Sequence, residues 1–513
     1  MFLKKYFYFI FVFITGAVIM MIEMAAFRLA TPYFGASLFV WANIIGLVMT
    51  ALATGYYLGG KLADWRPEEK ILMFIVLFSG LFISFLPILN KFFLPYFTGT
   101  SKIFSFSKSI ALSSFCFLSL LFFIPLLLLG IVSPFVIRLQ NKKLETTGFT
   151  SGSVYAFSTI GSIFGTFLAS FCIIPFLGIN KTFLISAFSL ILISLIGLRK
   201  KIKKSLFLIL LTPILLNCSY LAKRENLIYQ KESFYGLIEI IKNEDLGYVL
   251  DINRSGRWSV YHPKKILTDM YFDYFTPLYF LLKKKEKRDI LIIGHAGGVI
   301  SRQYSHFFKD KNLKIDGVEL DPEVTKAAYR FFNLAEQENL NVINEDGRIY
   351  LHKSTKKYDL IFIDAYIGNL YIPFQLSTKE FFELTNSRLK EDGILAIMVL
   401  SHQLNKEKTF RYLSQTVKSV YPHTYFFPSK SRHEHFILGS KFPLKERITT
   451  LEERTEINEL KEISLDISQN FQEIEKIKTK YLLKDNLAPL ELLREFDNMT
   501  LIFEYLRKNL KFP

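Results

Sequence analysis

The stretch DILIIGHAGG, residues 289–298, decides the fold of the second half of the chain. Ile290–Ile293 is an apolar run with the length of a buried strand, and the glycines after it let the backbone turn into a helix. Helical stretches such as Pro322–Phe332 and Thr378–Leu389 lie between later runs of the same kind. Those runs are Ile315–Leu320, Asn341–Asn344, Leu360–Ile363, Ile394–Leu400, Thr424–Phe427 and His435–Leu438. Strands that alternate with helices predict an α/β Rossmann-like domain whose mostly parallel sheet binds ligands at the carboxyl ends of its strands.

Two further segments flank this region. Before it, residues 234–263 alternate in short runs bounded by Asn, Asp and Gly, which predicts a small region of β-hairpins. After it, Arg447–Lys480 is charged, with heptad-like apolar spacing interrupted at Ser464, which predicts a solvated packing helix rather than a partner site. We therefore expect four parts, at residues 1–221 (membrane), 222–285 (hairpins), 286–440 (sheet) and 441–513 (helical extension).

The first of these parts is strongly apolar. Half of the 513 residues of the chain are apolar, and 52 of them are Phe. A membrane-spanning helix needs about 20 mostly apolar residues, and the last of the candidate stretches is short and contains Pro213. The candidates are Tyr6–Ala30, Leu38–Gly60, Ile71–Leu89, Ser109–Ile137, Ser151–Leu177, Thr182–Leu198 and Ser205–Leu221. The sequence therefore predicts an α-helical membrane domain of about seven spans.

Positive charge is unevenly distributed over the chain. Residues 1–221 carry +13 of the formal net charge of +17, and the remainder is close to balanced. Thirteen Lys and Arg fall on one side of the predicted spans and five on the other. Since basic residues crowd cytoplasmic loops, we expect a cytoplasmic N-terminus. A nearly balanced second half argues against the basic face that nucleic-acid binding requires.

Small residues and charges inside the predicted spans allow two interpretations. Gly55 and Gly59 have the four-residue spacing that lets helices approach closely, as do Gly161 and Gly165. Residues 35–42 and 152–157 also resemble each other loosely, which could record an internal duplication of the kind that transporters often show. An ionisable residue within a span is either functional or paired. Glu23 is such a residue in the first span, and its expected partner is Arg28.

Four successive strands of the predicted sheet end in residues suited to a nucleoside. The first ends in the turn Gly294–Gly298, where the backbone can approach a ligand closely. The second ends at Glu319, which can accept both hydroxyls of a ribose. The third ends at Asp346, beside Gly347, where a carboxylate can accept an exocyclic adenine amine, and the fourth ends at Asp364. Each acid could instead only cap the following helix, but four such tips together favour a binding site.

These segments resemble the spermidine synthase family. The similarity lies in Gly294–Gly298, Val318–Pro322, Glu345–Arg348 and Tyr358–Tyr366, with further likeness in Glu232–Tyr235, Thr378–Phe381, Lys390–Gly393 and Lys484–Glu491. Met21–Arg28, Gly59–Asp64 and Val154–Gly178 resemble the bacterial group that fuses a transporter-like membrane region to such a domain. The resemblance implies the S-adenosylmethionine-dependent methyltransferase fold and a multi-pass protein of the bacterial inner membrane, and it allows a homodimer.

The same resemblance implies aminopropyl transfer from decarboxylated S-adenosylmethionine to an amine acceptor. It assigns cosubstrate binding to Gly294, Gly298, Glu319, Asp346 and Gly347, and catalysis to Asp364 and Tyr366. The chain departs from the family at Ile367, which replaces a second Asp, and at Asp269–Tyr271, where Met270 stands in a Tyr-His-Glu segment. A diammonium acceptor without paired carboxylates loses its electrostatic anchoring. The acceptor therefore stays open, and Asp269, Tyr271 and Tyr366 could form a rearranged site.

Other chemistry-bearing residues are weaker candidates. His433 and His435 alternate as in a strand rather than at metal-ligand spacing, so no metal site is expected. His295 is expected to be an exposed loop histidine, or else to stack on the cosubstrate, and His402 to face the acceptor pocket. The three cysteines all lie in apolar stretches of the first half, so the second half cannot contain a disulfide framework.

Three functions follow from these observations. The first is the membrane-bound aminopropyltransferase, and the second is a methyltransferase that uses S-adenosylmethionine on a small or lipid-proximal acceptor. The third is a transporter or sensor whose nucleoside-binding lobe does not turn over. Seven spans would place the second half outside the cell, whereas an adenosyl cosubstrate favours the cytoplasm.

Overall fold

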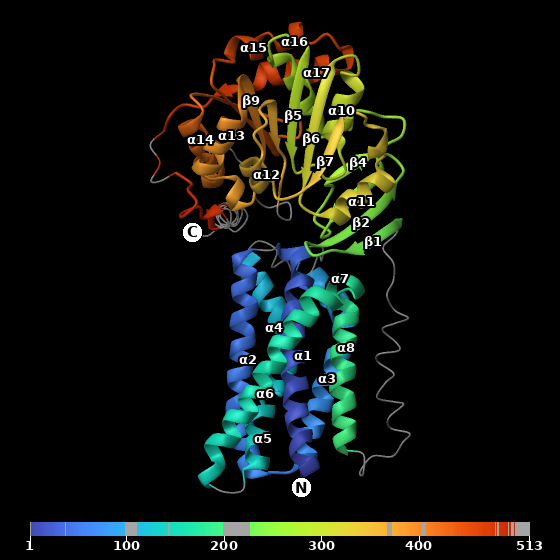
Figure 1. Ribbon diagram of the computed structural model, residues 1–513, viewed down its shortest axis with the longest axis vertical. Coiled ribbons are helices and arrows are strands. Elements are labelled where there is room, and N and C mark those ends of the chain that lie inside the picture. The colour runs from blue at the N-terminus through green and yellow to red at the C-terminus, as the bar shows by residue number, and fades with distance from the viewer. Residues whose placement is uncertain are drawn as a thin grey trace, which may run out of the picture. The chain divides into compact units, whose positions relative to one another are not determined.

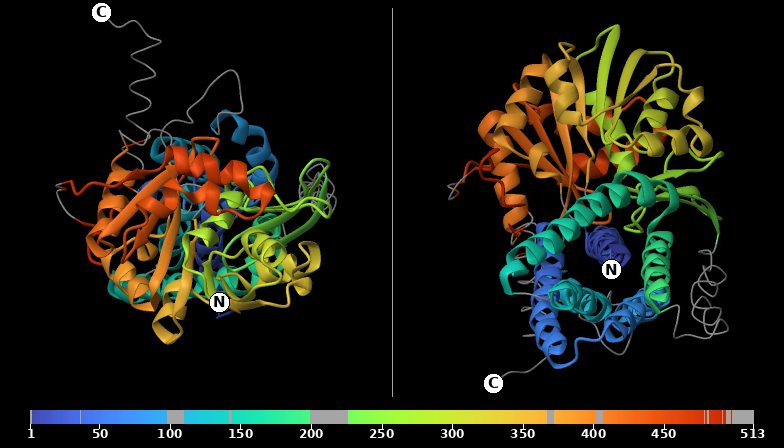
Figure 2. Two further views of the ribbon diagram at one scale, coloured as in Figure 1. Left: turned by 90° about the horizontal axis from the view of Figure 1, so that it is seen from above. Right: turned by 60° about the horizontal axis from the view of Figure 1, so that its bottom comes forward.

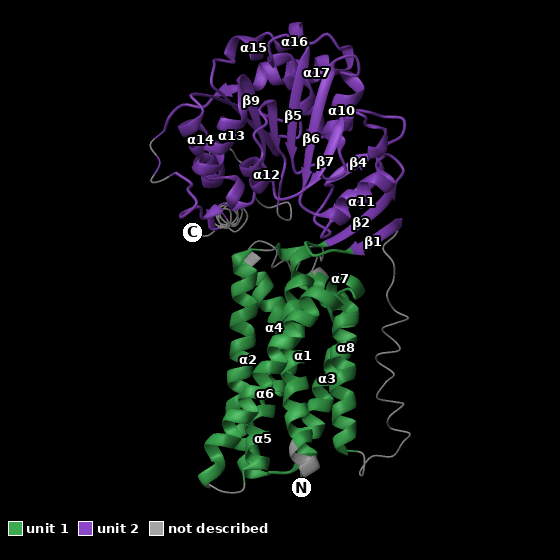
Figure 3. Ribbon diagram, in the orientation of Figure 1, with its two compact units in different colours: residues 1–224, 232–236 green, residues 225–231, 237–513 purple. Residues whose placement is uncertain are grey.

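The computed structural model describes residues 2–35, 37–97, 110–141, 144–198, 226–366, 372–401 and 407–477, and also 479, 482–490, 492–493 and 497 (Figure 1). The chain forms two compact units (Figure 3). The first comprises residues 1–224 and 232–236, and the second comprises residues 225–231 and 237–513.

The first unit is a bundle of long apolar helices. Its elements are α1 (Phe2–Phe34), α2 (Leu38–Trp65), α3 (Glu69–Phe97), α4 (Ile110–Gly130), α5 (Val132–Gln140), α6 (Thr147–Phe167), a π-helical turn (Leu168–Ile173), α7 (Ile174–Leu177) and α8 (Ile179–Leu198). Six helices among the described residues are long and apolar enough to cross a membrane, with α4–α5 and α6–α7 each counted as one. The expectation of seven spans is thus corrected to six, and the remaining stretch, residues 205–221, lies outside the described residues.

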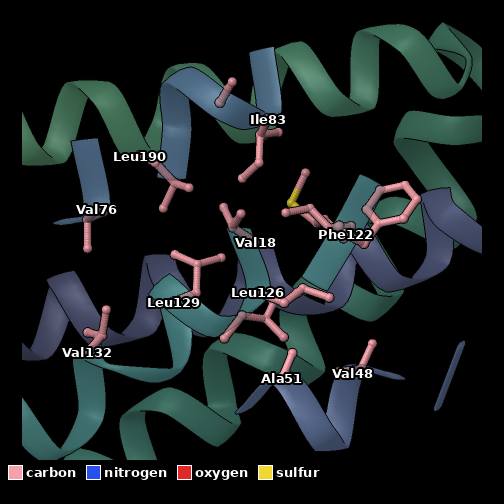
Figure 4. Packing of buried hydrophobic residues seen from close by; sticks show 14 of the residues in the cluster. Val18, Val48, Ala51, Val76, Ile83, Phe122, Leu126, Leu129, Val132 and Leu190 are labelled. Atoms are coloured by element: carbon pink, nitrogen blue, oxygen red, sulfur yellow. The ribbon is translucent and has the colours of Figure 1, made fainter. Parts of the chain in front are cut away.

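Helix α1 is the centre of this bundle. It packs chiefly against α6, while α2 packs against α4 and α3 against α8 (Figure 2, right). The core contains Val18, Val48, Leu126 and Leu190 (Figure 4). Glu23 is also buried in this unit, so the first helix carries an ionisable group inside its apolar packing.

The glycine spacing in this unit is a packing device. A Cβ added at Gly55 would lie 2.3 Å from the carbonyl oxygen of Leu127, and one at Gly165 would lie 2.1 Å from that of Ala17. Gly161 meets Phe13 in the same way. Since no side chain fits at these distances, the backbones of α2 and α4, and of α1 and α6, approach each other directly, as the four-residue spacing predicts.

The second unit begins with a small antiparallel sheet. Its strands, in spatial order, are β1 (Leu227–Glu232), β2 (Leu237–Asn243), β3 (Gly247–Ile252) and β4 (Ser259–Tyr261). Ile238, Ile240 and Leu250 are buried in a cluster with residues of α11 (Pro322–Phe331). The expected hairpin region is therefore present.

The large sheet has eight strands in the order β12-β10-β11-β9-β8-β5-β6-β7. They are β5 (Lys287–Ile293), β6 (Asn312–Glu319), β7 (Leu340–Asn344), β8 (Tyr358–Ile363), β9 (Leu389–Leu400), β10 (His423–Pro428), β11 (Glu434–Ser440) and β12 (Gln472–Glu473). Strands β5 to β9 pair in parallel, whereas β11 and β10 are antiparallel. Every strand expected from the sequence is found, and the sheet is mixed at one end.

Helices cover both faces of this sheet (Figure 1). One face packs against the 3-10 helix η3 (Tyr271–Leu281), α10 (Val299–Phe307), α15 (Lys445–Thr449), α16 (Leu451–Arg454) and α17 (Asn458–Asn470). The other packs against α12 (Gly347–Lys353), α13 (Lys379–Arg388) and α14 (Lys408–Val420). The parallel strands are therefore continuous buried apolar segments, as expected for a sheet covered on both faces.

The charged stretch after the sheet packs against it, but it is not one helix. It forms α15, α16, α17 and the short strand β12. Leu460 and Ile467 are buried, and Ser464 lies in the same buried seam, where its hydroxyl pairs with Thr455 Oγ1 at 2.8 Å. This hydroxyl pair explains how a polar residue interrupts the apolar spacing without an unpaired buried group.

Candidate functional site

The second unit contains a cavity of about 380 Å³ at the carboxyl ends of β5, β8 and β9. Gly294, Asp364 and Leu400 mark those three strand ends, and Glu434 begins the antiparallel strand β11 beside them. Its described wall also contains Arg257, Trp258, Ser259, Met270, Tyr271, Phe272, His295, Ala296, Val299, Ile300, Tyr366, Met398 and His433. A cavity of this size at this edge has the position and volume of a small-molecule site. We call it the strand-end cavity.

The glycine turn is required by the close approach of two strand ends. Gly294 has φ +87°, and a Cβ there would lie 2.3 Å from the carbonyl oxygen of Asp364. Gly298, at φ +77°, is the N-cap of α10. Both positions lie in the left-handed region that favours glycine. The turn therefore places the start of α10 beside the end of β8.

Glu319 holds this turn from the neighbouring strand. Its Oε2 accepts a hydrogen bond from the Ala296 amide at 2.9 Å, and its Oε1 accepts one from the Asp321 amide at 3.0 Å. Burial raises the pKa of Glu319, although these amide hydrogen bonds oppose the shift. Each carboxylate oxygen keeps a second lone pair that a ribose hydroxyl could use.

Asp346 is the N-cap of α12. Its Oδ1 accepts hydrogen bonds from the amides of Arg348 and Ile349, at 2.9 and 3.0 Å. Gly347 follows it because a Cβ there would lie 2.4 Å from Ile293 Cγ2. The capping interpretation therefore describes this acid. Both capping bonds use Oδ1, so Oδ2 is the oxygen that a ligand could use.

Asp364 is the carboxylate of the strand-end cavity with the most altered acidity. Burial raises its pKa to about 7. The Tyr271 hydroxyl donates a hydrogen bond to its Oδ2 at 3.2 Å, which lowers the pKa and partly offsets burial. Burial and the charge of Asp364 together hold the pKa of Tyr271 well above its usual value, so this phenol stays protonated. Asp364 can therefore take up or release a proton near neutral pH.

Tyr366 lies in the same wall, but its hydroxyl is already engaged. It donates to the carbonyl oxygen of Met398 at 3.0 Å and accepts from the Leu400 amide at 2.8 Å. The side chain therefore ties the segment after β8 to the end of β9. The catalytic role expected of Tyr366 from the sequence stays a prediction.

The predicted site residues fall into two groups. Gly294, Asp364 and Tyr366 line the strand-end cavity. The other four predicted residues lie outside its described wall, at the neighbouring ends of β6 and β7 or at the start of α10; they are Gly298, Glu319, Asp346 and Gly347. Ile367 and His402 lie outside the described residues. Sheet order still places the four predicted strand ends side by side, because β8, β5, β6 and β7 are successive neighbours.

His295 is not the exposed loop histidine that was expected, and its stacking on a cosubstrate stays a prediction. The side chain is neither an exposed loop histidine nor a free ring, because it is 4% exposed and its Nε2 lies 2.8 Å from Ser301 Oγ. Ser301 Oγ in turn donates to the Gly298 carbonyl oxygen at 3.0 Å. Burial lowers the pKa of His295 to about 4, and a Cβ on Gly317 would lie 2.4 Å from the ring. The neutral ring therefore packs between the glycine turn and Gly317 of β6.

Sequence reasoning missed Glu434. Its Oε2 accepts hydrogen bonds from the hydroxyls of Ser429, at 2.8 Å, and Ser431. The alternating histidines on either side identify a strand, and β11 indeed pairs Glu434 with Leu400 of β9. An acid at the first position of that strand was the available signal. Only the antiparallel pairing brings it to the carboxyl edge of the parallel strands.

Comparison with known proteins agrees with this geometry. The spermine/spermidine synthase domain family matches residues 279–431, which hold the glycine turn and all four strand ends. The second unit therefore contains a spermine/spermidine synthase domain, and the fold and relatives support a transferase enzyme.

Three curated relatives are polyamine aminopropyltransferases by name. The probable enzyme of Bifidobacterium longum is 30% identical over 286 residues, covering 52% of this chain and 62% of that protein. The Vibrio vulnificus enzyme is 25% identical, covering 53% and 92%. Polyamine aminopropyltransferase 2 of Aquifex aeolicus is 25% identical over 470 residues, covering 87% and 90%. The last match is longer than the second unit, so it extends into the helical bundle.

Solved structures are more distant. A probable spermidine synthase from Corynebacterium glutamicum is 16% identical, with a TM-score of 0.38, covering 54% of this chain and 94% of that one. A spermidine synthase in complex with the transition-state analogue AdoDATO is 22% identical, also at 0.38, covering 47% and 85%. The domain assignment rests on the sequence matches.

Proposed function

We propose that the chain is a membrane-bound transferase that moves an aminopropyl group from decarboxylated S-adenosylmethionine to an amine acceptor. The observation that carries the proposal is Asp364, a buried carboxylate whose pKa is raised to about 7, at the end of β8 and beside the glycine turn. The named relatives support the same reaction. The six long apolar helices of the first unit support attachment to a membrane.

The proposed cosubstrate site is the row of strand ends next to the strand-end cavity. Glu319 would accept the ribose hydroxyls with its remaining lone pairs, and Asp346 Oδ2 would accept the adenine amine. Gly294 and Gly298 would let the backbone approach the rest of the cosubstrate. The sulfonium of that cosubstrate supplies an activated carbon, so the protein needs to position the acceptor and remove its proton.

Asp364 is the proposed general base. As the C–N bond to the acceptor forms and the C–S bond breaks, the proton lost by the acceptor amine passes to Asp364, and methylthioadenosine leaves. A base with a pKa of about 7 is suited to this transfer at neutral pH, because enough of it is ionised while it still binds the proton well. Tyr271 orients the carboxylate through its hydroxyl.

Product analysis with the full-length protein in detergent tests this proposal. We expect methylthioadenosine to appear only when decarboxylated S-adenosylmethionine and an amine are both present. Absence of product with a panel of diamines and longer polyamines, while the protein binds methylthioadenosine, would reject the transfer and leave a non-catalytic binding lobe.

A methyltransferase is the second candidate. It is favoured by Met270, which lines the strand-end cavity where the resembled family has a polar segment. It predicts S-adenosylhomocysteine as the product and tighter binding of S-adenosylmethionine than of its decarboxylated form. The same product analysis therefore separates the two reactions.

The sidedness of the second unit is part of the proposal. An adenosyl cosubstrate requires a cytoplasmic location, with the N-terminus on the same side. We expect a reporter fused after Pro513 to be active only as a cytoplasmic reporter. Activity of an exterior reporter would contradict both transferase candidates.

A further inference from the structure

An aspartate near the C-terminal end of the second unit clasps the start of α12. Asp485 Oδ1 accepts a hydrogen bond from Arg348 Nη1 at 2.7 Å, and its Oδ2 accepts one from Arg348 Nη2 at 2.6 Å. Arg348 is the second residue of α12, directly after Gly347. Two parallel bonds of this kind are the geometry in which a guanidinium binds a carboxylate most strongly. They join two positions that are 137 residues apart in the chain.

Further hydrogen bonds fix both partners of this pair. Arg348 Nη1 also donates to the carbonyl oxygen of Gln375 at 3.0 Å, and the Thr378 hydroxyl donates to Asp485 Oδ1 at 2.7 Å. The Asp485 amide donates to Glu380 Oε2 at 3.1 Å. Thr378 is the N-cap of α13, so Asp485 lies between the first turns of α12 and α13. The guanidinium is therefore directed toward α13 and the C-terminal segment.

The backbone of the same arginine contacts Asp346. The Arg348 amide donates to Asp346 Oδ1, which leaves Oδ2 as the oxygen proposed to accept the adenine amine. The pKa of Arg348 is raised by its hydrogen bond to Asp485 first, and also by the charges of Glu380 and Asp346. Asp346 thus attracts the guanidinium, although its hydrogen bonds are made to Asp485. An arginine released from Asp485 would have the carboxylate of Asp346 within its influence.

We propose that Asp485 is a positioning residue of the cosubstrate site, because it holds the Arg348 guanidinium away from Asp346. The inference rests on the proposed function, since it concerns how the adenine end of the cosubstrate is bound. While the guanidinium is clasped, Asp346 Oδ2 stays available to the exocyclic amine. Without Asp485, the guanidinium pairs with Asp346 and the amine loses its acceptor, because a cation is a stronger partner for a carboxylate than a neutral amine is.

A purely structural role is the alternative for Asp485. Its side chain is 45% exposed, and an ion pair at such a position contributes little to stability by itself. A second aspartate of the same segment shows what a structural role looks like. Asp497 is buried and accepts hydrogen bonds from the amides of Lys408 and Thr409, at 2.8 and 3.0 Å, so it caps α14. Asp497 therefore serves as the structural comparison.

The test measures, by calorimetry on the full-length protein in detergent, the binding of methylthioadenosine and of methylthioinosine. Methylthioinosine has a carbonyl oxygen where methylthioadenosine has the exocyclic amine. Wild type should bind methylthioadenosine at least about tenfold more tightly, since an oxygen facing Asp346 leaves both groups without a hydrogen bond. Asp485→Asn keeps the size of the side chain but removes its charge. It should weaken methylthioadenosine binding about fivefold and leave methylthioinosine nearly unchanged.

Removal of the arginine provides the second variant. Arg348→Gln in the Asp485→Asn background removes the competing cation, so the preference for methylthioadenosine should return to within about twofold of the wild-type value. Arg348→Gln alone should also keep the preference, for the same reason. This single variant tests the inference even where Asp485→Asn does not fold, because loss of the preference would show that the arginine itself supports adenine binding.

Two control variants separate positioning from stability. Asp497→Asn should lower the melting temperature without changing the preference between the two nucleosides. Glu383→Gln removes another half-exposed ion pair of α13, in which Lys379 Nζ lies 3.3 Å from Glu383 Oε1. Since this pair does not include Arg348, its loss should change neither nucleoside.

The outcomes distinguish the inference from the function. Asp485→Asn with the wild-type preference, or with both nucleosides weakened equally, would overturn the positioning role. A double variant that binds methylthioadenosine no better than Asp485→Asn would do the same. Equal binding of both nucleosides by wild type would remove the role of Asp346 on which the inference depends. Wild type that binds neither nucleoside would overturn the proposed function itself.

Discussion

Buried aspartates toward the two edges of the large sheet have opposite kinds of partner. Toward the amino ends of the parallel strands, Asp359 accepts from Lys390 Nζ at 2.7 Å, and Lys356 reaches Asp316 at 2.8 Å. At the carboxyl edge, the donor to Asp364 is the neutral hydroxyl of Tyr271. Asp359 and Asp316 are thus paired with lysines, whereas Asp364 is paired with a neutral hydroxyl.

The acidities follow this difference. Burial alone would raise the pKa of Asp316, but the hydrogen bonds from Lys356 and Tyr358 outweigh it and lower the pKa. Burial of Asp364 has no such opposition from a cation, and its pKa rises to about 7. A buried acid paired with lysines stabilises the fold, whereas a buried acid without a cation is available for proton transfer or for a cationic ligand.

The largest expected effect is on activity. Asp364→Asn keeps the size of the side chain but removes the base, so kcat/KM for aminopropyl transfer should fall by about 10³-fold. In wild type, kcat/KM should rise with pH and level off above about 7, because the carboxylate must be ionised to accept a proton. Steady-state kinetics at pH values from about 5.5 to about 8.5 measure both effects, because this range brackets the pH at which Asp364 titrates. Full activity of Asp364→Asn would remove this residue from the mechanism.

A substitution toward the amino ends of the parallel strands should lower stability rather than activity. Asp359→Asn leaves Lys390 and Lys285 without their shared carboxylate, whose side chain is only 1% exposed. Lys390 keeps Asp289 and Lys285 keeps Asp392 as partners, and both lysines are partly exposed, so the loss should be about 1–3 kcal/mol of unfolding free energy. Denaturant unfolding measures this loss, while kcat per folded molecule should stay near wild type. A fall in kcat with unchanged stability would reverse the assignment of the two edges.

A smaller effect concerns the pH dependence of stability. The folded-state pKa of Asp364 is above the unfolded value, so its stabilising contribution is complete at low pH and is lost as pH rises through about 7. Asn mimics the protonated acid. Asp364→Asn should therefore be more stable than wild type at pH 8, and the difference should shrink as the pH falls toward 5, roughly the region where Asp364 is protonated. Melting temperatures at both pH values measure it; a constant difference would contradict the raised pKa.

The smallest effect is a shift of the activity profile. The Tyr271 hydrogen bond lowers the pKa of Asp364 against burial, so Tyr271→Phe should raise that pKa further. The pH–rate curve should move to higher pH, with kcat at its plateau reduced by about tenfold or less. Tyr279→Phe, in the same helix but outside the strand-end cavity, is the control. An unshifted curve would show that Tyr271 does not act on the base.

Much of the architecture could be predicted from residues close together in sequence. The strand Ile290–Ile293 with its glycines, the acid at each later strand end, and the apolar helices all depend on local pattern. The seventh span was not confirmed, and the charged tail was divided into short helices because turns interrupt its periodicity. The expectation that His295 is exposed was wrong, because its burial depends on Gly317, in the neighbouring strand.

The sequence alone determined which strands end in Gly294, Glu319, Asp346 and Asp364, since strand length and helix starts are local properties. Only the tertiary structure decided which of these side chains reach the strand-end cavity and that Glu434 and Tyr271 join Asp364 there. The reason is that an acid's role depends on its neighbours across strands, which set its desolvation and its donors. Sheet pairing between segments far apart in the chain supplies those neighbours.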